Sequence, residues 1–317
     1  MTLNYENIGK PLAEIVNKNN KDTKTKNKVV SLAEDFEMDK VKNPMEQINL
    51  PPHEIFQQIP DNVSPKITRR KILYTSGASG SGKTYYSADY IKKYVKQYPQ
   101  NRVILFSSLD EDDTLDKIKQ VKRVQVKQAG FVDETFKIEM FADTLVIFDD
   151  TDCIKDKKII KQISHISDIV LQTGRHTNTS MIFTSHLSCA GNATKMILNE
   201  SHSIIFFPSA MTPHSLKYLC MTYVGLDSKQ VELIKKEKSR WICSFKSCPK
   251  VLMTINRMCF VRDYGDKQME PINELSGGGC GEVEISGKIK CEGCGAMIRA
   301  DNKRRHEKTP RHLNSLR

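Results

Sequence analysis

The hydrophobic positions between residues 71 and 207 form short, continuous apolar runs that alternate with helical patterns. The runs predict five strands, at residues 71–76, 102–108, 144–150, 180–185 and 203–207. The patterns between them predict helices at residues 84–98, 155–172 and 192–201. Continuous apolar strands separated by helices are typical of a parallel sheet covered on both faces. We therefore predict an α/β fold with a mostly parallel sheet flanked by helices.

The pattern changes on either side of this core. Residues 215–224 and 227–238 extend the helical layer, and residues 240–246 and 250–255 predict a terminal hairpin. Residues 1–62 are polar and weakly periodic, and we expect them to be partly disordered, notably in the low-complexity stretch NKNNKDTKTKNK. We predict four segments: the N-terminal segment 1–62, a main domain 63–262, a Gly-rich linker 263–287 and a small C-terminal domain 288–317.

The stretch GASGSGKT follows the first predicted strand and opens the first predicted helix. It fits the pattern G-x-x-x-x-G-K-[ST], in which small residues let backbone N–H groups surround the phosphates of a nucleotide. Lys83 would reach the β- and γ-phosphates, and the Thr84 hydroxyl would bind Mg²⁺. The alternative is an ordinary Gly/Ser turn. The predicted nucleotide-binding residues are Gly77, Ala78, Ser79, Gly80, Ser81, Gly82, Lys83 and Thr84.

Two carboxylates end the third predicted strand, LVIFDD. Four apolar residues before an acid at the carboxyl end of a strand are typical of the Walker B motif, which places a carboxylate beside the metal. Asp149 would hold Mg²⁺, and Asp150 would orient the attacking water. The alternative is a turn or a helix cap, because DDTD is also good capping chemistry.

The segment QTGRHTNTSMIFTSH supplies the remaining catalytic candidates. A polar residue at the end of the fourth strand commonly contacts the γ-phosphate, so Thr184, Ser185 and His186 are candidates. Arg175 is a candidate to stabilise charge on the transferring phosphoryl group, in cis or from a neighbouring subunit. Arg175 is otherwise an ordinary ion-pair residue, and His186 a buried core histidine. The predicted catalytic residues are Lys83, Asp150, Arg175, Ser185 and His186.

Charge is concentrated in two places. The chain has a net charge of +11. Residues 229–250 carry seven Lys and Arg against two Asp and Glu, and residues 288–317 carry nine against three. Clustered basic charge indicates a polyanionic partner, although a solvated basic face explains 229–250 equally well.

The C-terminal stretch CEGCGAMIRADNKRRHEKTPRH places two cysteines and two histidines as C-x2-C-x11-H-x5-H. This spacing predicts a tetrahedral Zn²⁺ site, and the metal would supply the folding energy of so short a segment. The alternative is a disordered basic tail. The predicted ligands are Cys291, Cys294, His306 and His312. The N-terminus lacks a signal peptide, and no apolar run approaches the ~20 residues of a membrane span, so we expect an intracellular protein without a membrane partner.

Three motifs in this order, GASGSGKT, TLVIFDD and GRHTNTSMIFTSH, resemble the poxvirus-type DNA-packaging ATPases of the FtsK–HerA P-loop superfamily, over about residues 65–255. The tail resembles small zinc fingers appended to giant-virus proteins. The resemblance implies phosphate and Mg²⁺ roles for Lys83 and Thr84, metal and water roles for Asp149 and Asp150, and a trans-acting Arg175. The chain departs from the superfamily in having Ser185-His186 where Gln or Asn usually serves as sensor.

These observations predict an ATPase that translocates double-stranded DNA as a homo-oligomeric ring, most simply to load a viral genome into a capsid. The expected cofactors are ATP, Mg²⁺ and Zn²⁺, and a capsid or portal-vertex protein is a further expected partner. Its expected location is the host cytoplasm or a viral factory, with association with the virion. Two alternatives remain: a nucleotide kinase, and a zinc-finger DNA-binding regulator that uses ATP as a switch.

Overall fold

A computed structural model describes residues 1–18, 27–61, 70–189, 191–264, 288–290 and 297–299. The chain divides into two compact units, Met1–Lys267 and Gln268–Arg317. In the second unit the described backbone forms one antiparallel pair, β15 (Lys288–Lys290) with β16 (Met297–Arg299). The four predicted zinc ligands and residues 265–287 of the predicted Gly-rich linker lie outside the described residues, so these predictions stay open.

The first unit is built on a ten-stranded sheet whose described strands run in the order β4-β14-β13-β12-β11-β6-β10-β9-β7-β8. The pairs from β8 to β11 are parallel, and those from β11 to β4 are antiparallel. Its parallel strands are β8 (Val121–Val124), β7 (Arg102–Ser107), β9 (Thr144–Asp149), β10 (Ser180–Ser185), β6 (Ile72–Ser76) and β11 (Ser203–Phe206). Its antiparallel strands are β12 (Ile242–Phe245), β13 (Val251–Met253), β14 (Arg257–Phe260) and β4 (Gln47–Asn49).

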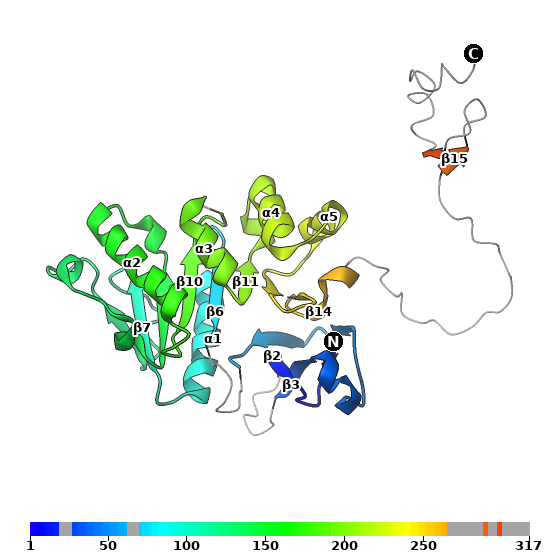
Figure 1. The fold of residues 1–317 in the computed structure, drawn as a ribbon, viewed down its shortest axis with the longest axis horizontal. Helices are drawn as coiled ribbons and strands as arrows, with labels where there is room; N and C mark the ends of the chain where they lie inside the picture. Colours follow the sequence, from blue (N-terminus) through cyan, green and yellow to red (C-terminus); the bar gives the residue numbers. More distant parts are fainter. Residues whose placement is uncertain (19–26, 62–69, 190, 265–287, 291–296, 300–317) are drawn as a thin grey trace, which may run out of the picture. The chain divides into compact units, whose positions relative to one another are not determined.

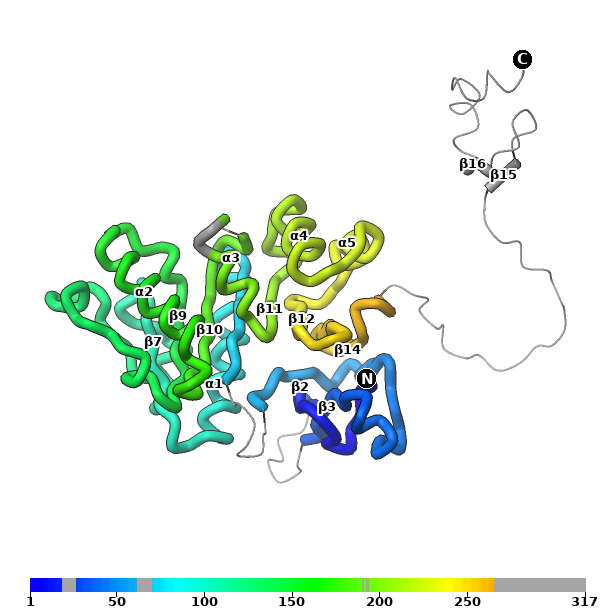
Figure 2. The backbone as a smooth tube through the Cα atoms, viewed as in Figure 1, coloured from blue at the N-terminus to red at the C-terminus, as the bar shows by residue number. Residues whose placement is uncertain are grey.

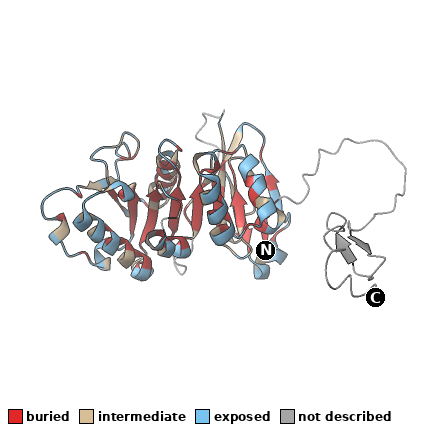
Figure 3. Cartoon of the chain, turned by 90° about the horizontal axis from the view of Figure 1, so that it is seen from above, coloured by how far each residue is buried: buried red, intermediate tan, exposed pale blue. Residues whose placement is uncertain are grey.

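Helices cover both faces of this sheet, and the strands are apolar throughout for that reason. In β9, Leu145 and Ile147 join the core on one face, whereas Val146 and Phe148 join the core on the other. Helix α1 (Lys83–Gln97) packs into the first core. Helices α2 (Lys157–Thr173), α3 (Asn192–Glu200), α4 (Pro213–Leu219) and α5 (Ser228–Lys236) pack into the second. The strands are buried and the outer helix faces exposed (Figure 3). The predicted fold class is confirmed.

Local sequence determines where these helices begin. The Asp156 carboxylate accepts hydrogen bonds from the backbone N–H groups of Lys158 and Ile159 at the start of α2. A reciprocal capping box, Asp227 with Gln230, opens α5. The predicted helix at 215–224 is α4 followed by one π-helical turn, Cys220–Val224. No helix in the described part of the chain is both long and apolar enough to cross a membrane.

The N-terminal segment contains more structure than its sequence predicts. Strands β1 (Thr2–Asn4), β3 (Lys28–Ala33), β2 (Lys10–Asn17) and β5 (Glu54–Gln58) form a second, antiparallel sheet (Figure 1). The strand β4, which lies between β3 and β5 in the sequence, pairs with β14 and so joins the large sheet. Figure 2 shows the N-terminal strands β2 and β3 in blue and β14 in yellow to orange. The N-terminal strands were not predicted from the sequence, and apolar residues from both sheets share one core. The low-complexity residues 19–26 lie outside the described part, and the predicted domain boundaries remain predictions.

Candidate functional site

The loop GASGSGKT connects β6 to α1, as its motif requires. Gly80 and Gly82 have φ angles of +74° and +111°, which a residue with a Cβ rarely adopts. Lys83 is buried in the first turn of α1, and its Nζ donates a hydrogen bond to the carbonyl oxygen of Gly77 at 2.9 Å. Thr84 follows it on the same turn. The loop therefore curls around its own lysine at the N-terminus of a helix.

The loop has the properties of a phosphate cradle. A Cβ at Gly77 would lie 2.7 Å from Ser81 Oγ, whereas one at Gly80 would meet no atom within 4 Å. The buried Ser81 hydroxyl has no hydrogen-bond partner among the described residues. The positive end of the α1 dipole and the Lys83 ammonium favour an anion at this point. The residues thus fit the phosphates of a nucleotide.

Paired carboxylates face this loop from the end of β9. Asp150 Oδ1 lies 3.5 Å from Lys83 Nζ. The buried Thr184 hydroxyl, near the end of β10, lies 2.9 Å from Asp149 Oδ1 and 3.2 Å from Asp150 Oδ1. It also accepts a hydrogen bond from the Asp150 backbone N–H at 2.9 Å. Three neighbouring parallel strands, β6, β10 and β9, therefore bring both acids and the phosphate-loop lysine to one sheet edge.

The two acids are chemically distinct. Burial, reinforced by the charge of Asp150, raises the pKa of Asp149 to about 6. Asp150 is half-buried and adopts a left-handed backbone conformation, φ +48°, before the 3₁₀ turn Thr151–Cys153. It occupies the N-cap position of that turn without a side-chain capping bond, so capping does not explain it. Adjacent carboxylates and the Thr84 hydroxyl are oxygen donors of the kind that Mg²⁺ prefers.

Ser185 and His186 contact a third acid, Asp152, which no sequence motif assigns to the site. The Asp152 Oδ2 atom accepts hydrogen bonds from the Ser185 hydroxyl at 2.9 Å and from the His186 backbone N–H at 2.8 Å. His186 Nδ1 lies 3.3 Å from Asp152 Oδ1 and 3.5 Å from Asp150 Oδ1. His186 is therefore a partly exposed site residue, and the alternative of a buried core histidine is wrong.

Arg175 lies at the opposite edge of the sheet. It follows α2 and precedes Ser180, where β10 begins, while the phosphate loop meets the end of β10 at Ser185. A six-residue strand separates these ends by roughly 17 Å. Arg175 is exposed, and its guanidinium has no hydrogen bond or ion pair with another described residue. A cis role is thereby excluded by geometry, and the trans role remains a prediction.

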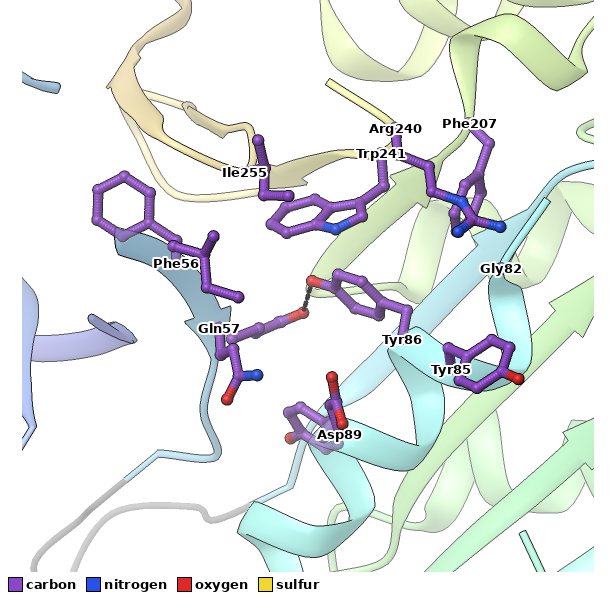
Figure 4. Close-up of a pocket in the computed structure, with 13 residues that line it drawn as sticks. Phe56, Gln57, Gly82, Tyr85, Tyr86, Asp89, Phe207, Arg240, Trp241 and Ile255 are labelled. Atoms are coloured by element: carbon purple, nitrogen blue, oxygen red, sulfur yellow. Dashed lines mark hydrogen bonds between the residues drawn. The ribbon is translucent and has the colours of Figure 1, made fainter. Parts of the chain in front are cut away.

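A cavity of about 160 Å³ adjoins the phosphate loop on the side of α1. Tyr86 and Trp241 meet edge to face across it, with ring centroids 5.0 Å apart (Figure 4). Arg240 lies beside Gly82, and its guanidinium donates to the carbonyl oxygens of Ser81 at 2.8 Å and Gly80 at 3.2 Å. The sequence analysis did not assign Tyr86, Arg240 or Trp241 to the site. The signal that could have indicated this cavity is the pair Tyr85-Tyr86 directly after Thr84.

The basic stretch 229–250 is only partly available to a partner. Arg240 contacts the phosphate loop, Lys246 donates to backbone carbonyls at the end of α3, and Lys250 donates to the Tyr223 carbonyl. Lys235 pairs with Glu232. The exposed lysines of this stretch without an ion pair to a described residue are Lys229, Lys236 and Lys238.

The loop between β6 and α1, the acids at the end of β9 and the mostly parallel sheet together define a P-loop NTPase fold. No protein-family model matches the chain. It is 35% identical over 187 residues to the uncharacterized protein V3 of Sputnik virophage, a match that covers 58% of this chain and 75% of that protein. The chain belongs to the same family as V3.

Solved structures resemble the chain more distantly. The genome packaging NTPase B204 of Sulfolobus turreted icosahedral virus 2, in complex with ATP-gammaS, is 17% identical; the match covers 61% of this chain and 98% of B204, with a TM-score of 0.41. The cytoplasmic domain of the type VII secretion ATPase EccC of Thermomonospora curvata is 9% identical, with coverage of 71% and 30% and a TM-score of 0.43. The pCW3 conjugation coupling protein TcpA is 12% identical, with 78% coverage of both chains and a TM-score of 0.38. These likenesses are too distant to argue from.

Proposed function

We propose that the protein is an ATPase whose hydrolysis of ATP drives translocation of double-stranded DNA, packaging a viral genome into a capsid. The observation that carries the catalytic part is the meeting of Lys83 and Asp150, 3.5 Å apart, at the edge where the phosphate loop and β9 end. At this separation the two groups are in ion-pair contact, so a phosphoryl group bound beside them would face both a phosphate-binding cation and a water-orienting carboxylate.

Each residue has a separate role in this proposal. The loop N–H groups and Lys83 bind the β- and γ-phosphates, and bound Mg²⁺ would neutralise phosphate charge. Asp149 and Thr84 hold that ion, while Asp150 orients the attacking water and accepts its proton. Thr184 keeps the two carboxylates in register by contacting both. His186, near Asp150, is the proposed γ-phosphate sensor, with Ser185 holding Asp152 beside it. The aromatic cavity next to Gly82 would hold the nucleobase.

The proposed assembly is a ring in which Arg175 acts on the nucleotide of a neighbouring subunit. Its exposure and its position on the sheet edge away from its own phosphate loop support this role. A head-to-tail contact of this kind joins unlike surfaces and closes into a ring when the rotation permits. Mixed-subunit assays, described in the Discussion, test it.

The DNA part of the proposal rests on the motif resemblance, on a relative from a virophage and on the distribution of charge. Four exposed lysines lie just before α2 or in its first two turns, after the carboxylates: Lys155, Lys157, Lys158 and Lys161. None forms an ion pair with a described residue. Such lysines would contact DNA phosphates without reading bases. Their attachment to the Asp150 turn would connect DNA contact to hydrolysis.

ATP turnover with and without double-stranded DNA tests the whole proposal. We expect DNA-stimulated hydrolysis in the wild type, and Asp150→Asn should keep ATP binding while losing turnover. Near-wild-type turnover of Asp150→Asn would contradict the assignment. Phosphoryl transfer to an added nucleoside monophosphate would indicate a kinase instead. Nucleotide-dependent DNA binding without turnover would indicate an ATP-switched regulator.

Two charge variants, which remove four and three lysines, test the DNA surface. Replacing the four α2 lysines by Gln should reduce DNA stimulation. It should also make the salt dependence of DNA binding shallower, by about one unit of slope for each DNA phosphate that is no longer neutralised. Replacing Lys229, Lys236 and Lys238 by Gln is the control, since these exposed lysines lie on or after α5. Equal effects of the two variants would show that charge alone, and not its location, governs binding.

The capsid partner, the location in a viral factory or virion and the zinc-binding tail are the finer parts of this proposal. The tail would act as a separate DNA grip. Deleting residues 288–317 should leave basal turnover intact, because the proposed catalytic residues all precede residue 190, and should weaken DNA binding. An unchanged salt slope after the deletion would exclude the tail from DNA contact.

A further inference from the structure

Three side chains of different chemistry converge next to the carboxylate edge: the Asp152 carboxylate, the Cys153 thiol and the His186 imidazole. Their ligand atoms all lie within 4.8 Å of one another. Asp152 and Cys153 belong to the 3₁₀ turn after β9, and His186 follows β10. We propose that this cluster is a second metal site, distinct from the Mg²⁺ site, that binds a thiophilic divalent transition-metal ion such as Zn²⁺ and inhibits hydrolysis.

The measured separations suit such an ion. In a tetrahedral site with Zn–N, Zn–O and Zn–S bonds of about 2.0–2.3 Å, the N···S and N···O edges are about 3.6 and 3.4 Å. His186 Nδ1 lies 3.3 Å from Cys153 Sγ and 3.3 Å from Asp152 Oδ1. Two edges are therefore close to those of a coordination tetrahedron, and the third, between Cys153 Sγ and an Asp152 carboxylate oxygen, is within 4.8 Å.

The residues around the cluster hold it in this arrangement. The second oxygen of Asp152 accepts hydrogen bonds from the Ser185 hydroxyl and the His186 backbone N–H, which leaves Oδ1 facing the imidazole. Hydrogen bonds of this kind to a ligating carboxylate orient it in protein metal sites. The hydrogen bond from the His186 backbone N–H to Asp152 does not depend on a side chain, so it persists when the surrounding side chains are substituted.

The ligand set selects the type of metal. A thiol and an imidazole favour Zn²⁺ and related ions over Mg²⁺, which prefers oxygen ligands. When the metal–sulfur bond forms, the thiol proton passes to solvent, so one proton is released per ion bound at this ligand. The proposed tail site has two cysteines, whereas this cluster has one, and the two sites are therefore separable by thiolate count.

The site's position gives it a consequence for hydrolysis. His186 Nδ1 is 3.5 Å from Asp150 Oδ1, which in turn is 3.5 Å from Lys83 Nζ. A second divalent ion here would add positive charge beside the carboxylate that is proposed to accept a proton from water. That charge would attract the Asp150 carboxylate away from the attacking water and should slow hydrolysis without preventing ATP binding.

Cobalt substitution in the full-length chain tests binding without any nucleotide. Cys291→Ser with Cys294→Ser removes the predicted tail site and serves as the background. There, Co²⁺ should bind with about one ion per chain and produce a thiolate-to-metal charge-transfer band. Adding Cys153→Ser should abolish the band. Adding Cys248→Ser, at another exposed thiol, should keep it. Ser185→Ala should weaken binding by about 10–100-fold.

Absence of the band in the background chain, or its persistence in Cys153→Ser, would overturn the proposal. Circular dichroism checks that each variant is folded. The inhibitory role has its own readout: stoichiometric Zn²⁺ should slow ATP turnover of the background chain but not of its Cys153→Ser variant. Equal inhibition of both would refute that role. Because binding is measured without ATP, a failure of the proposed ATPase activity would leave the metal result unaffected.

Discussion

The two edges of the parallel sheet differ in charge and in how their residues are used. At the carboxyl edge, three acids contact residues of the same chain. Asp149 and Asp150 both contact Thr184, and Asp150 also pairs with Lys83 of the phosphate loop. Asp152 accepts a hydrogen bond from Ser185. At the amino edge the basic groups differ in availability: Arg70 donates to the last carbonyls of α2, buried Lys71 pairs with Asp61, and Arg175 is exposed. The exposed Arg175 is complementary in charge to the acids of the carboxyl edge, which favours contact between unlike edges of two subunits.

Strand direction explains why the phosphate loop and the acids at the carboxyl edge form a site within one chain, whereas Arg175 at the amino edge does not join it. Strands in parallel register bring their carboxyl ends together, so residues ending β9 and β10 must meet the loop after β6. Arg175 precedes β10 and is carried to the far edge. A second subunit is therefore required to complete the proposed catalytic set.

The largest expected effect is at the amino edge. Arg175→Ala should lower ATP turnover by about 10³–10⁵-fold, because an arginine that acts in trans stabilises transition-state charge. Turnover of purified variants measures this, with exposed neighbouring His176→Ala as the control. Mixing Arg175→Ala with Asp150→Asn subunits should restore activity above either parent, since some interfaces regain an intact pair. A mixture no better than its better parent would leave Arg175 with a structural role.

At the carboxyl edge, Asp150→Asn should lower kcat by about 10²–10⁴-fold, because the proton acceptor is removed. Binding of a fluorescent ATP analogue should remain, since Lys83 and the loop are unchanged. Lys83→Ala should instead abolish binding. If both variants failed equally to bind the analogue, Asp150 would act in holding the loop and not in the chemical step.

The carboxyl edge should also depend on pH through Asp149. Its pKa, raised to about 6 by burial and by Asp150, means that protons compete with Mg²⁺ below that pH. Affinity for Mg²⁺-nucleotide should therefore fall by about tenfold per pH unit below 6 and level off above it. Titrations between pH 5 and 8 measure this, and Asp149→Asn should remove the dependence together with most of the affinity. An affinity that is flat across this range in the wild type would show that Asp149 is not a ligand.

The smallest effect concerns stability at the amino edge. Burial, together with nearby positive charges led by Lys71, lowers the pKa of His202 from 6.5 to about 3. As pH falls, His202 is protonated in the unfolded chain before it is protonated in the folded chain. The contribution of neutral His202 to the free energy of unfolding is therefore complete above pH 6.5 and is lost progressively down to about pH 3. Urea unfolding should show a decrease of up to about 1.4 kcal/mol per pH unit at this site. His202→Gln should flatten the dependence, whereas exposed His176→Gln should leave it unchanged.

The sequence predicts the elements in which the local pattern of apolar residues agrees with which residues are buried in the structure. β9 and β10 were predicted because both faces are largely buried and each strand contains a continuous apolar run. β8 was missed because Val121–Val124 is a short edge strand that is nowhere fully buried. β2 and β5 were missed because their apolar faces pack against residues distant in sequence. The same holds at the site: the loop and its acids have local motifs, whereas Arg240 and Asp152 acquire their roles only through tertiary contacts.

The strand β4 has a consequence for the order in which the chain assembles. It pairs with β14, and Arg257 reaches Gln47 across a separation of 210 residues. During synthesis, the N-terminal strands therefore emerge long before the strand that completes their attachment. Pairing over so long a separation is slow to form and leaves strand edges exposed in the meantime. Strand β4 can therefore join the large sheet only after β14 has been synthesised. A chain interrupted before β14 retains the phosphate loop and both carboxylates but has no partner for β4.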